Sequence, residues 1–301
     1  MTYRRTAAAL CALSIALTAV AARTAAEDPP EYGPAKGTLV VVGGGNLDGT
    51  GIVERFIQLA GGPDASIVIV PTAGGNRNAD GSVRAYGEAE VVGPWLKRGL
   101  KNVRMLHTHD PKVADTDAFA AVLRAANGVW FNGGRQWNIV DSYMNTLTYR
   151  EFHTVLARGG VIGGSSAGAT IQGDYLVRGA IAGPQIMMTP EQEHERGFNF
   201  LRRTAIDQHI NTRNRWDDLI PVIQKMPDLL GIGLSEGTAI VVTGDRFEVM
   251  GKWKVAVHDN SRLYQPWEKT YVVLSPGDIF NMKTRKIEKL GTGAGERRQE
   301  E

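Results

Sequence analysis

The chain contains 301 residues, of which 43% are hydrophobic and 22% are charged, a composition typical of a folded soluble protein of one or two domains. Its formal net charge of +2 lacks the basic excess of nucleic-acid-binding domains, so no nucleic-acid partner is expected. Cys11 is the only cysteine, which excludes an intramolecular disulfide.

Residues 1–26 have the composition of a secretory signal peptide. Two arginines near the start precede an apolar run over residues 7–22, and small residues follow up to Ala26. The run is short for a membrane span, so we expect cleavage near Ala22 or Ala26, with an uncleaved anchor as the alternative. Cleavage would remove Cys11 and 3 of the 34 basic residues, leaving 31 against 32 acidic residues. We therefore expect an exported protein, periplasmic or extracellular, with no stable membrane association.

Residues 27–37 are rich in proline, glycine and charge, which predicts a linker or flexible arm. A single domain over residues 38–290 follows, in which short apolar strands alternate with helices. Fully apolar strands separated by helices are typical of a parallel sheet buried on both faces, so we expect a three-layer α/β/α sandwich. The predicted strands are 38–42, 66–70, 103–106, 128–131 and 160–163, and the predicted helices are 51–60, 85–98, 115–126, 137–145 and 149–158.

Beyond residue 231 the pattern changes to closely spaced strands without helices between them. This spacing predicts antiparallel strands added to the same domain. The expected strands are 231–234, 239–242, 246–250, 254–258 and 269–274. The polar residues 291–301 are expected to form a disordered tail.

A G-x-S-x-G pattern over residues 164–168 follows the predicted strand at 160–163. A serine on a tight turn between a strand and a helix needs neighbours without bulk, and the helix N-terminus then favours an oxyanion. The structural alternative is a Gly/Ser-rich turn with no chemistry. The pattern becomes informative only with a base and an orienting partner for the serine.

His209 is the candidate base with the most suggestive surroundings, because it lies in a dense polar cluster over residues 207–215 after a predicted strand. Glu236 follows an apolar strand and is a candidate third partner. A hydrogen-bonded loop histidine and an exposed turn carboxylate are the structural alternatives, and a solvated or ion-paired role is the alternative for Arg213 and Arg215. The other histidines beyond residue 26 are His107, His109, His153, His194 and His258.

Four segments together resemble the cyanophycinases, a serine peptidase family that also contains aspartyl dipeptidases. They occur in the family's order, and the resemblance extends from about residue 38 to 275. The segments are Asn132-Gly133-Gly134-Arg135-Gln136, Gly164-Ser165-Ser166-Ala167-Gly168-Ala169, Asp207-Gln208-His209 with Arg213 and Arg215, and Gly231 to Ala239. The resemblance implies a class I glutamine amidotransferase-like (flavodoxin-like) fold, a homodimer, and catalysis with neither metal nor cofactor.

The resemblance also assigns roles. It implies Ser166 as the nucleophile, His209 as the general base and then acid, and Glu236 as the group that orients His209. The amides of Gly134 and Ala167 would form the oxyanion hole. The substrate would be held by Gln136, Asp207, Gln208, Arg213 and Arg215. The implied substrate is cyanophycin, an aspartate chain that carries arginine on each side-chain carboxyl, and the implied product is the β-aspartyl-arginine dipeptide.

Some positions depart from the family's pattern near the expected substrate pocket. Arg135 stands where aspartate is common, Asp217 and Asp218 follow Trp216 where another arginine is usual, and Ser235 stands where aspartate is frequent. These departures leave the proposed triad intact. They leave open a different isopeptide or an aspartyl dipeptide as the substrate.

Two other functions remain open from the sequence. An esterase of the α/β-hydrolase type would use Ser166, then Asp228 or Asp245, then His258, and a noncatalytic binding protein would keep the fold alone. The loops at 76–86 and 186–198 are expected to shape the pocket, with Met187, Met188, Glu191, Glu193 and His194 as candidate contacts in the second. His107 and His109 are spaced like two metal ligands, but without a carboxylate cluster nearby they do not predict a metal site.

Overall fold

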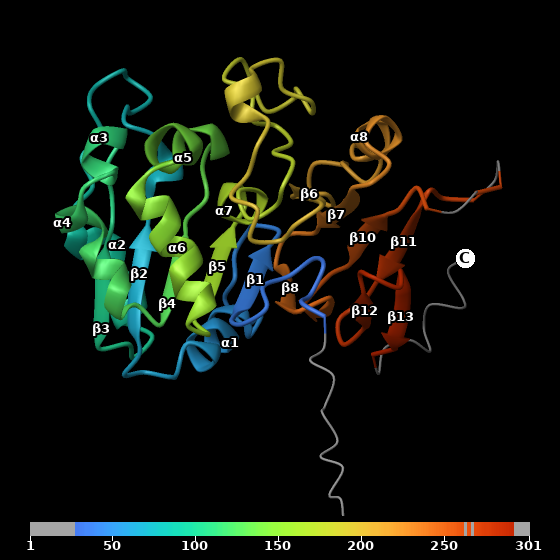
Figure 1. Cartoon of the computed structure of the whole chain (residues 1–301), viewed down its shortest axis with the longest axis horizontal. Helices are drawn as coiled ribbons and strands as arrows, with labels where there is room; N and C mark the ends of the chain where they lie inside the picture. The colour runs from blue at the N-terminus through green and yellow to red at the C-terminus, as the bar shows by residue number, and fades with distance from the viewer. Residues whose placement is uncertain (1–27, 262–263, 266–267, 292–301) are drawn as a thin grey trace, which may run out of the picture.

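The structure is a computed structural model that describes residues 28–261, 264–265 and 268–291. In these residues a nine-stranded sheet has the strand order β13-β12-β9-β8-β1-β5-β4-β2-β3. Its parallel part consists of β1 (Thr38–Val42), β5 (Val161–Ser165), β4 (Gly128–Phe131), β2 (Ser66–Val70) and β3 (Asn102–Met105). The expected parallel sheet is confirmed, and Figure 1 shows its strands rising together beside their helices.

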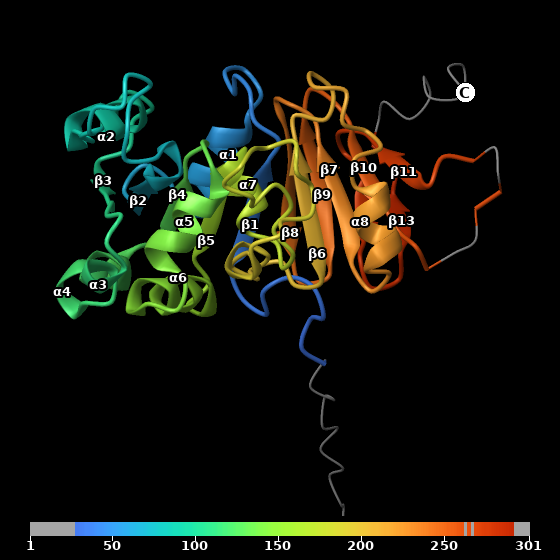
Figure 2. The same cartoon turned by 90° about the horizontal axis from the view of Figure 1, so that it is seen from above.

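Helices cover both faces of this parallel part, as Figure 2 shows from above. Consecutive strand residues point to opposite faces, and β4 illustrates the result. Trp130 packs against Phe56, with ring centroids 5.0 Å apart, while its neighbour Phe131 packs against Phe152, also at 5.0 Å. The helices on one face are α1 (Ile52–Leu59) and α2 (Glu88–Leu96), and those on the other are α3 (Pro111–Ala114), α4 (Asp117–Ala120), α5 (Gln136–Tyr143) and α6 (Leu147–Ala157).

The C-terminal strands extend the sheet on the other side of β1. The sheet becomes antiparallel at β8, because β8 pairs with β1 in the opposite direction. The added strands are β8 (Thr238–Thr243), β9 (Arg246–Gly251), β12 (Ile279–Asn281) and β13 (Lys286–Lys289). The expected C-terminal antiparallel strands are thus present.

A second sheet of four strands, counted over the described residues, has the order β11-β10-β7-β6. Its strands are β6 (Thr204–Gln208), β7 (Leu230–Leu234), β10 (Val255–His258) and β11 (Tyr271–Leu274). One buried cluster contains side chains from both sheets, including Ile232 and Val257 from this sheet and Val242 and Val249 from the larger one. β7 pairs antiparallel with β10, as expected. On its other edge it pairs in parallel with β6, because α8 (Ile220–Lys225) lies between β6 and β7 in the chain.

The expected linker has no helix or strand over residues 28–37, yet it is held against the fold rather than forming a free arm. Tyr32 is buried, and its backbone N–H donates to Asp245 Oδ1 at 2.8 Å. Gly33 N–H donates to the carbonyl oxygen of Gly244 at 3.0 Å. Arg202 binds the carbonyl oxygens of Pro30, Glu31 and Gly33. These contacts give the segment partners that its composition did not reveal. The expected signal peptide and residues 292–301 lie outside the described residues.

The helix expected at 115–126 is present as α4 followed by a 3₁₀ helix, and a separate short helix, α3, precedes it. Asp110 Oδ1 accepts the N–H of Lys112 at 2.8 Å and caps α3, while Thr116 caps α4, which passes into the 3₁₀ helix η2 (Ala121–Ala125). Two capping residues six positions apart favour two short helices over one long one. Over the residues that the structure describes, no helix has both the length and the apolar character needed to cross a bilayer.

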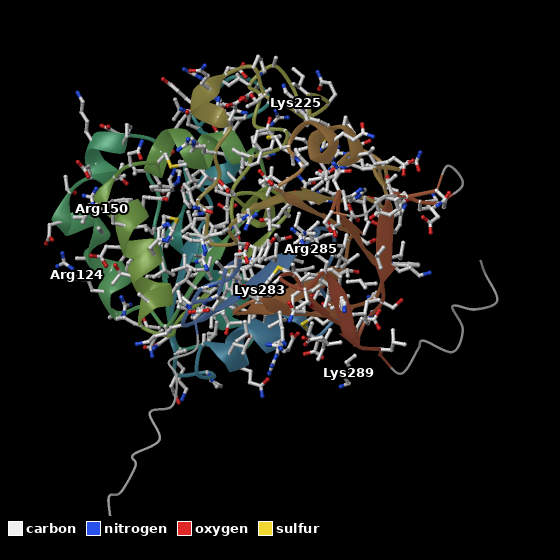
Figure 3. All side chains as sticks on the ribbon, turned by 45° about the vertical axis from the view of Figure 1, so that its right-hand side comes forward. Arg124, Arg150, Lys225, Lys283, Arg285 and Lys289 are labelled. Carbon is white, nitrogen blue, oxygen red and sulfur yellow. The ribbon has the colours of Figure 1, made fainter. Side chains whose placement is uncertain are left out.

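The basic side chains labelled in Figure 3 come from separated elements. Arg124 belongs to η2 and Arg150 to α6, on one side of the molecule. Lys283, Arg285 and Lys289 belong to the β12–β13 hairpin and lie away from these two, and Lys225 ends α8.

Candidate active site

Ser166 lies on the sharp turn between β5 and the short helix α7 (Ala167–Thr170), with φ 58° and ψ −116°. This left-handed backbone is uncommon for a residue with a side chain. The turn is so tight that a Cβ on Gly164 would lie 2.2 Å from the carbonyl oxygen of Gly168, and one on Gly168 would lie 2.1 Å from that of Phe131. The two glycines of the G-x-S-x-G pattern are therefore required by packing, and the turn holds the half-buried serine at the carboxyl edge of the sheet.

His209 directly follows β6 and lies against Ser166. Its Nε2 is 2.8 Å from Ser166 Oγ. The backbone at His209 has φ 59°, and its N–H donates to the carbonyl oxygen of Gly43 at 2.9 Å. The end of β1 thus fixes the histidine that the end of β6 supplies, so the base candidate is positioned by strands of both sheets.

Glu236 follows β7 and completes a row of three side chains. Its Oε1 is 2.5 Å from His209 Nδ1. A carboxylate can only accept, so Nδ1 carries the proton and Nε2 is free to accept the Ser166 hydroxyl. The Glu236 backbone N–H donates to Asn211 Oδ1 at 2.9 Å. The sequence expectation that Ser166, His209 and Glu236 lie together agrees with this geometry.

The surroundings of His209 favour its neutral form, and those of Glu236 favour its ionised form. Burial lowers the pKa of His209, and the charge of Arg213 lowers it further, while the hydrogen bond to Glu236 opposes the shift. Burial raises the pKa of Glu236, but hydrogen bonds from His209 and Thr212 outweigh it, so the pKa of Glu236 lies below its ordinary value. A neutral imidazole beside a carboxylate is the form that can accept a proton from serine.

The glycines after β1 pack directly on this row. A Cβ on Gly44, where φ is 104°, would lie 2.2 Å from His209 Cε1. A Cβ on Gly45 would lie 2.8 Å from Glu236 Oε2. The sequence showed these glycines at the end of a strand but did not connect them with the histidine. Backbone hydrogen bonds bring them there, from His209 N–H to the carbonyl oxygen of Gly43 at 2.9 Å and from Gly237 N–H to that of Gly44 at 2.8 Å.

The turn after β4 lies on the other side of the serine. A Cβ on Gly133 would lie 3.2 Å from Ser166 Cβ and 3.7 Å from its Oγ. At Gly134 the φ is 146°, and a Cβ would lie 2.1 Å from the carbonyl oxygen of Ala73. Ala167 is the first residue of α7, where backbone N–H groups have no partner inside the helix. Of the two residues expected to form an oxyanion hole, Ala167 directly follows the serine, and Gly134 lies next to Gly133 in the turn that packs on it.

Asp207 differs from its expected role as an open substrate contact. It is fully buried, and both carboxylate oxygens are bound by Arg178, from Nε at 2.8 Å and from Nη2 at 3.0 Å. Arg178 is itself only 3% exposed, and Asp218 also binds its Nη2. Arg178 was missed by the sequence reasoning. A lone arginine within the apolar run Leu176-Val177-Arg178-Gly179-Ala180 was the available signal, because buried charges are nearly always paired.

Gln136 and Gln208 are both buried. Gln136 Nε2 donates to the carbonyl oxygens of Val177 at 2.8 Å and Arg178 at 2.9 Å, so both of its amide hydrogens serve the chain itself. Gln208 Oε1 is buried with no hydrogen-bond partner. Gln208 therefore has an unsatisfied acceptor next to His209, whereas Gln136 fixes the segment that carries Arg178.

The arginines expected around the site differ in exposure. Arg213 is exposed, while Arg215 is half-buried and its Nη1 lies 3.9 Å from Asp207 Oδ1. Arg135 is half-buried, and its Nη2 donates to the carbonyl oxygen of Ala180 at 3.0 Å. Burial lowers the pKa of both Arg215 and Arg135. Of these three arginines, Arg215 has Asp207 and Asp218 as acidic neighbours, and their charges oppose the lowering of its pKa.

The departures from the family's pattern have structural roles here. Asp218 binds Arg178, and Ser235 is fully buried, with its N–H donating to the carbonyl oxygen of Lys254 at 3.3 Å. The buried Ser235 hydroxyl has no hydrogen-bond partner.

The other histidines do not reach Ser166. His258 lies in β10, is 2% exposed, and packs against Tyr271 with ring centroids 4.7 Å apart. His107 and His109 stand edge to face at 4.8 Å, and His107 Nδ1 is 2.9 Å from Thr72 Oγ1. In the part of the chain that the structure describes, no group of three or more His, Cys, Asp or Glu side chains is arranged to hold a metal ion.

The loop at 186–198 is largely occupied by contacts within the protein. Met187 and Met188 pack against a buried cluster that contains Val177 and Leu219. His194 Nε2 is 2.6 Å from Asp141 Oδ1. Glu191 accepts a hydrogen bond from Thr189. The loop at 76–86, in contrast, borders a cavity together with the turn after β4.

A parallel sheet that presents a serine on a strand–turn–helix, in series with a histidine and a carboxylate, is the arrangement of a serine hydrolase. The chain belongs to peptidase family S51, whose model matches residues 39–250. The expected relation to the cyanophycinases and the expected class of enzyme, a serine peptidase, are confirmed by this match and by the relatives below.

Curated relatives and a solved structure agree with this assignment. The cyanophycinase of Synechococcus elongatus is 28% identical over 272 residues, covering 84% of this chain and 81% of its own length. That of Geminocystis herdmanii is 26% identical over 271 residues, covering 83% and 96%. The crystal structure of a peptidase from an acI-B1 Actinobacterium matches with a TM-score of 0.61 at 20% identity, covering 82% of this chain and 97% of that one. This last likeness supports the fold.

Proposed function

We propose that this protein is a serine exopeptidase that hydrolyses cyanophycin and releases β-aspartyl-arginine dipeptides. The observation that carries the proposal is the row of hydrogen bonds from Ser166 Oγ through His209 to Glu236. Membership of family S51 and relatives named cyanophycinase support the choice of substrate. A related aspartyl dipeptide or another isopeptide is the second candidate, favoured by the internal pairing of Asp207 with Arg178.

The reaction uses the side chains in a fixed order. Ser166 Oγ attacks the carbonyl carbon as its proton passes to His209 Nε2, and the amides of Gly134 and Ala167 receive the negative charge on the carbonyl oxygen. The C–N bond then breaks, and the leaving amine takes the proton from His209. A water molecule then attacks the acyl carbon as its proton passes to the same imidazole. The bond between the acyl carbon and Ser166 Oγ breaks, and the imidazolium returns the proton to Oγ. Glu236 stays ionised and stabilises the imidazolium.

The direct test is hydrolysis of purified cyanophycin, with mass spectrometry of the products. We expect β-aspartyl-arginine from the wild type and a loss of about a millionfold in kcat from Ser166→Ala, with an unchanged circular dichroism spectrum. Ser165→Ala is the matched control and should retain activity. Turnover by Ser166→Ala near the wild-type rate would reject the serine mechanism, whereas failure of the wild type on cyanophycin but not on aspartyl dipeptides would select the second candidate.

The histidine variants separate this proposal from an esterase that uses His258. His209→Ala should abolish hydrolysis, and His258→Gln should keep it, because Ser166 Oγ is within hydrogen-bond distance of His209. A noncatalytic binding protein would show no turnover with any of the tested substrates.

We also propose export, on the composition of residues 1–26. Sequencing the N-terminus of the protein isolated from its cells should find a start after Ala22 or Ala26. Recovery of a cytoplasmic protein that begins at Met1 would contradict export without affecting the proposed chemistry.

A further inference from the structure

We propose that a pocket between α2 and the turn after β4 is the subsite for the guanidinium group of a substrate arginine. The inference rests on the proposed function and deepens it. A substrate that carries arginine needs an acidic or aromatic partner near the serine. Asp207 is closed to it, since both of its oxygens are bound by the buried Arg178. The guanidinium must therefore be recognised elsewhere.

The pocket adjoins the nucleophile. It has a volume of about 480 Å³, and its lining includes Gly133 and Gly134 from the turn beside Ser166 together with Arg84, Tyr86, Glu90 and Trp95. A Cβ on Gly133 would lie 3.7 Å from Ser166 Oγ. A substrate residue bound at the serine thus has the pocket next to it, on the opposite side of the serine from His209.

The lining has the chemistry that a guanidinium prefers. Tyr86 offers an aromatic face, Gly74 a carbonyl oxygen and Glu90 a carboxylate. Tyr86 is held in place, because its hydroxyl donates to the carbonyl oxygen of Gly75 at 2.8 Å and its ring packs on that of His107 with centroids 4.2 Å apart. Guanidinium groups stack on aromatic faces and pair with carboxylates.

Arg84 shows how a guanidinium fits there. Its guanidinium carbon lies 4.8 Å from the centroid of the Tyr86 ring, and its Nη1 donates to the carbonyl oxygen of Gly74 at 3.1 Å. A Cβ on Gly74 would lie 2.4 Å from the Tyr86 hydroxyl oxygen, so the carbonyl and the ring meet only because residue 74 is glycine. The chain's own arginine thus occupies the place of the substrate's guanidinium.

Arg84 is able to leave without unravelling the loop. Its backbone N–H donates to the carbonyl oxygen of Asn76 at 2.9 Å, and Arg77 pairs with Val83 in an isolated bridge. The Arg84 side chain is exposed, and its contacts are individually weak. An incoming substrate arginine that also engages Glu90 would displace it, so Arg84 competes with the substrate.

The experiment measures binding of two synthetic oligomers to the inactive Ser166→Ala protein by calorimetry. One is (β-Asp-Arg)₃, and the other carries citrulline, the neutral isostere of arginine, at every arginine position. In this background Glu90→Gln should reduce the preference for the arginine oligomer about fivefold. Arg84→Gln should increase that preference about threefold, because it removes the competitor. Glu88→Gln is the matched control, since Glu88 lies on the same helix but binds Arg104.

Glu90→Gln and Arg84→Gln should change the preference for the arginine oligomer in opposite directions. If these residues had only a structural role, each substitution would weaken the binding of both oligomers equally. Equal effects of Glu90→Gln on the two oligomers, or a weaker preference in Arg84→Gln, would overturn the inference. Hydrolysis of cyanophycin by the wild type is assayed separately. If the wild type cleaves cyanophycin but Glu90→Gln leaves the preference for the arginine oligomer unchanged, the subsite is rejected and the proposed function is kept. If both variants change the preference as expected but the wild type does not cleave cyanophycin, the proposed function is rejected and the subsite is kept.

Discussion

Arg178 binds both carboxylate oxygens of Asp207 in the protein interior. Asp207 lies two residues before His209, the histidine that contacts Ser166. The charge pair therefore supports the end of the strand that positions His209. Because both of its oxygens are bound, the Asp207 carboxylate is not free for the role in substrate binding that the family resemblance implied.

Removing one partner of this pair should destabilise the protein strongly. Arg178→Leu leaves the fully buried Asp207 without its bidentate partner, and we expect a loss of about 3–5 kcal/mol in the free energy of unfolding. The double variant Arg178→Leu with Asp207→Leu should recover most of that loss. Urea unfolding measures both. The control Arg124→Leu breaks the solvent-exposed pair with Asp117 and should leave the free energy of unfolding nearly unchanged. An equally small effect of Arg178→Leu would contradict the prediction.

The acid limb of activity should report the environment of His209. Hydrolysis requires the neutral imidazole, so activity falls as the pH drops through the pKa of His209, which burial holds below its ordinary value. Arg213→Gln removes a positive charge that lowers this pKa, so the acid limb should move to higher pH. Glu236→Gln removes the negative charge that raises the pKa of His209. The acid limb of any residual activity should therefore move to lower pH. Profiles of kcat/KM against pH give the comparison, and a shift of both variants in one direction would argue against it.

Gly44 should tolerate no side chain, because a Cβ there would lie 2.2 Å from His209 Cε1. Gly44→Ala displaces the imidazole from Ser166, and a misplacement of about 1 Å lowers kcat/KM about 100-fold. Gly49→Ala is the matched control. Its φ of 69° is also positive, but no atom lies within 4 Å of the added Cβ, so it should cost about 1 kcal/mol of stability and leave kcat/KM intact. Equal activity of the two variants would refute the assigned contact.

His258 should make the fold sensitive to acid. Burial lowers its pKa to about 4 from an ordinary value of 6.5, so the unfolded chain binds a proton that the folded chain refuses between these values. Stability contributed by the neutral ring is present above pH 6.5 and is lost as the pH falls toward 4, up to about 3 kcal/mol. His258→Gln should flatten this dependence in urea unfolding at pH 7 and pH 4.5. An unchanged slope would place the acid sensitivity in other groups.

Local sequence patterns were sufficient for the strands of the parallel sheet. The bounds of β1, β2 and β4 agree with the predicted ranges, because short apolar runs between helices have few other ways to bury both faces. The capped helix α3, which lies before the helix expected at 115–126, depended on a cap that apolar spacing does not encode. The parallel pairing of β7 with β6 likewise depended on a crossover through α8.

Part of the candidate site could be predicted from the sequence. The glycines around Ser166 signal a tight turn by themselves, since their neighbours leave no room for a Cβ. His209 and Glu236 were assigned to the triad only with the help of a family resemblance, because their positions in the chain do not show that they lie close to Ser166 in space. Arg178 was overlooked, since its partner Asp207 lies 29 residues away.

The sequence by itself determined the parallel core, the serine turn and the family, because apolar periodicity and glycine placement act over a few residues. Only the tertiary structure decided which charges are paired in the interior and which line a pocket. The turn that carries Arg178 packs against the end of β6, where its guanidinium binds Asp207, and the pocket lined by Tyr86 and Glu90 remains beside the turn that contacts the serine. Electrostatic partners are set by proximity in space and by burial, and neither is written in the local pattern of the chain.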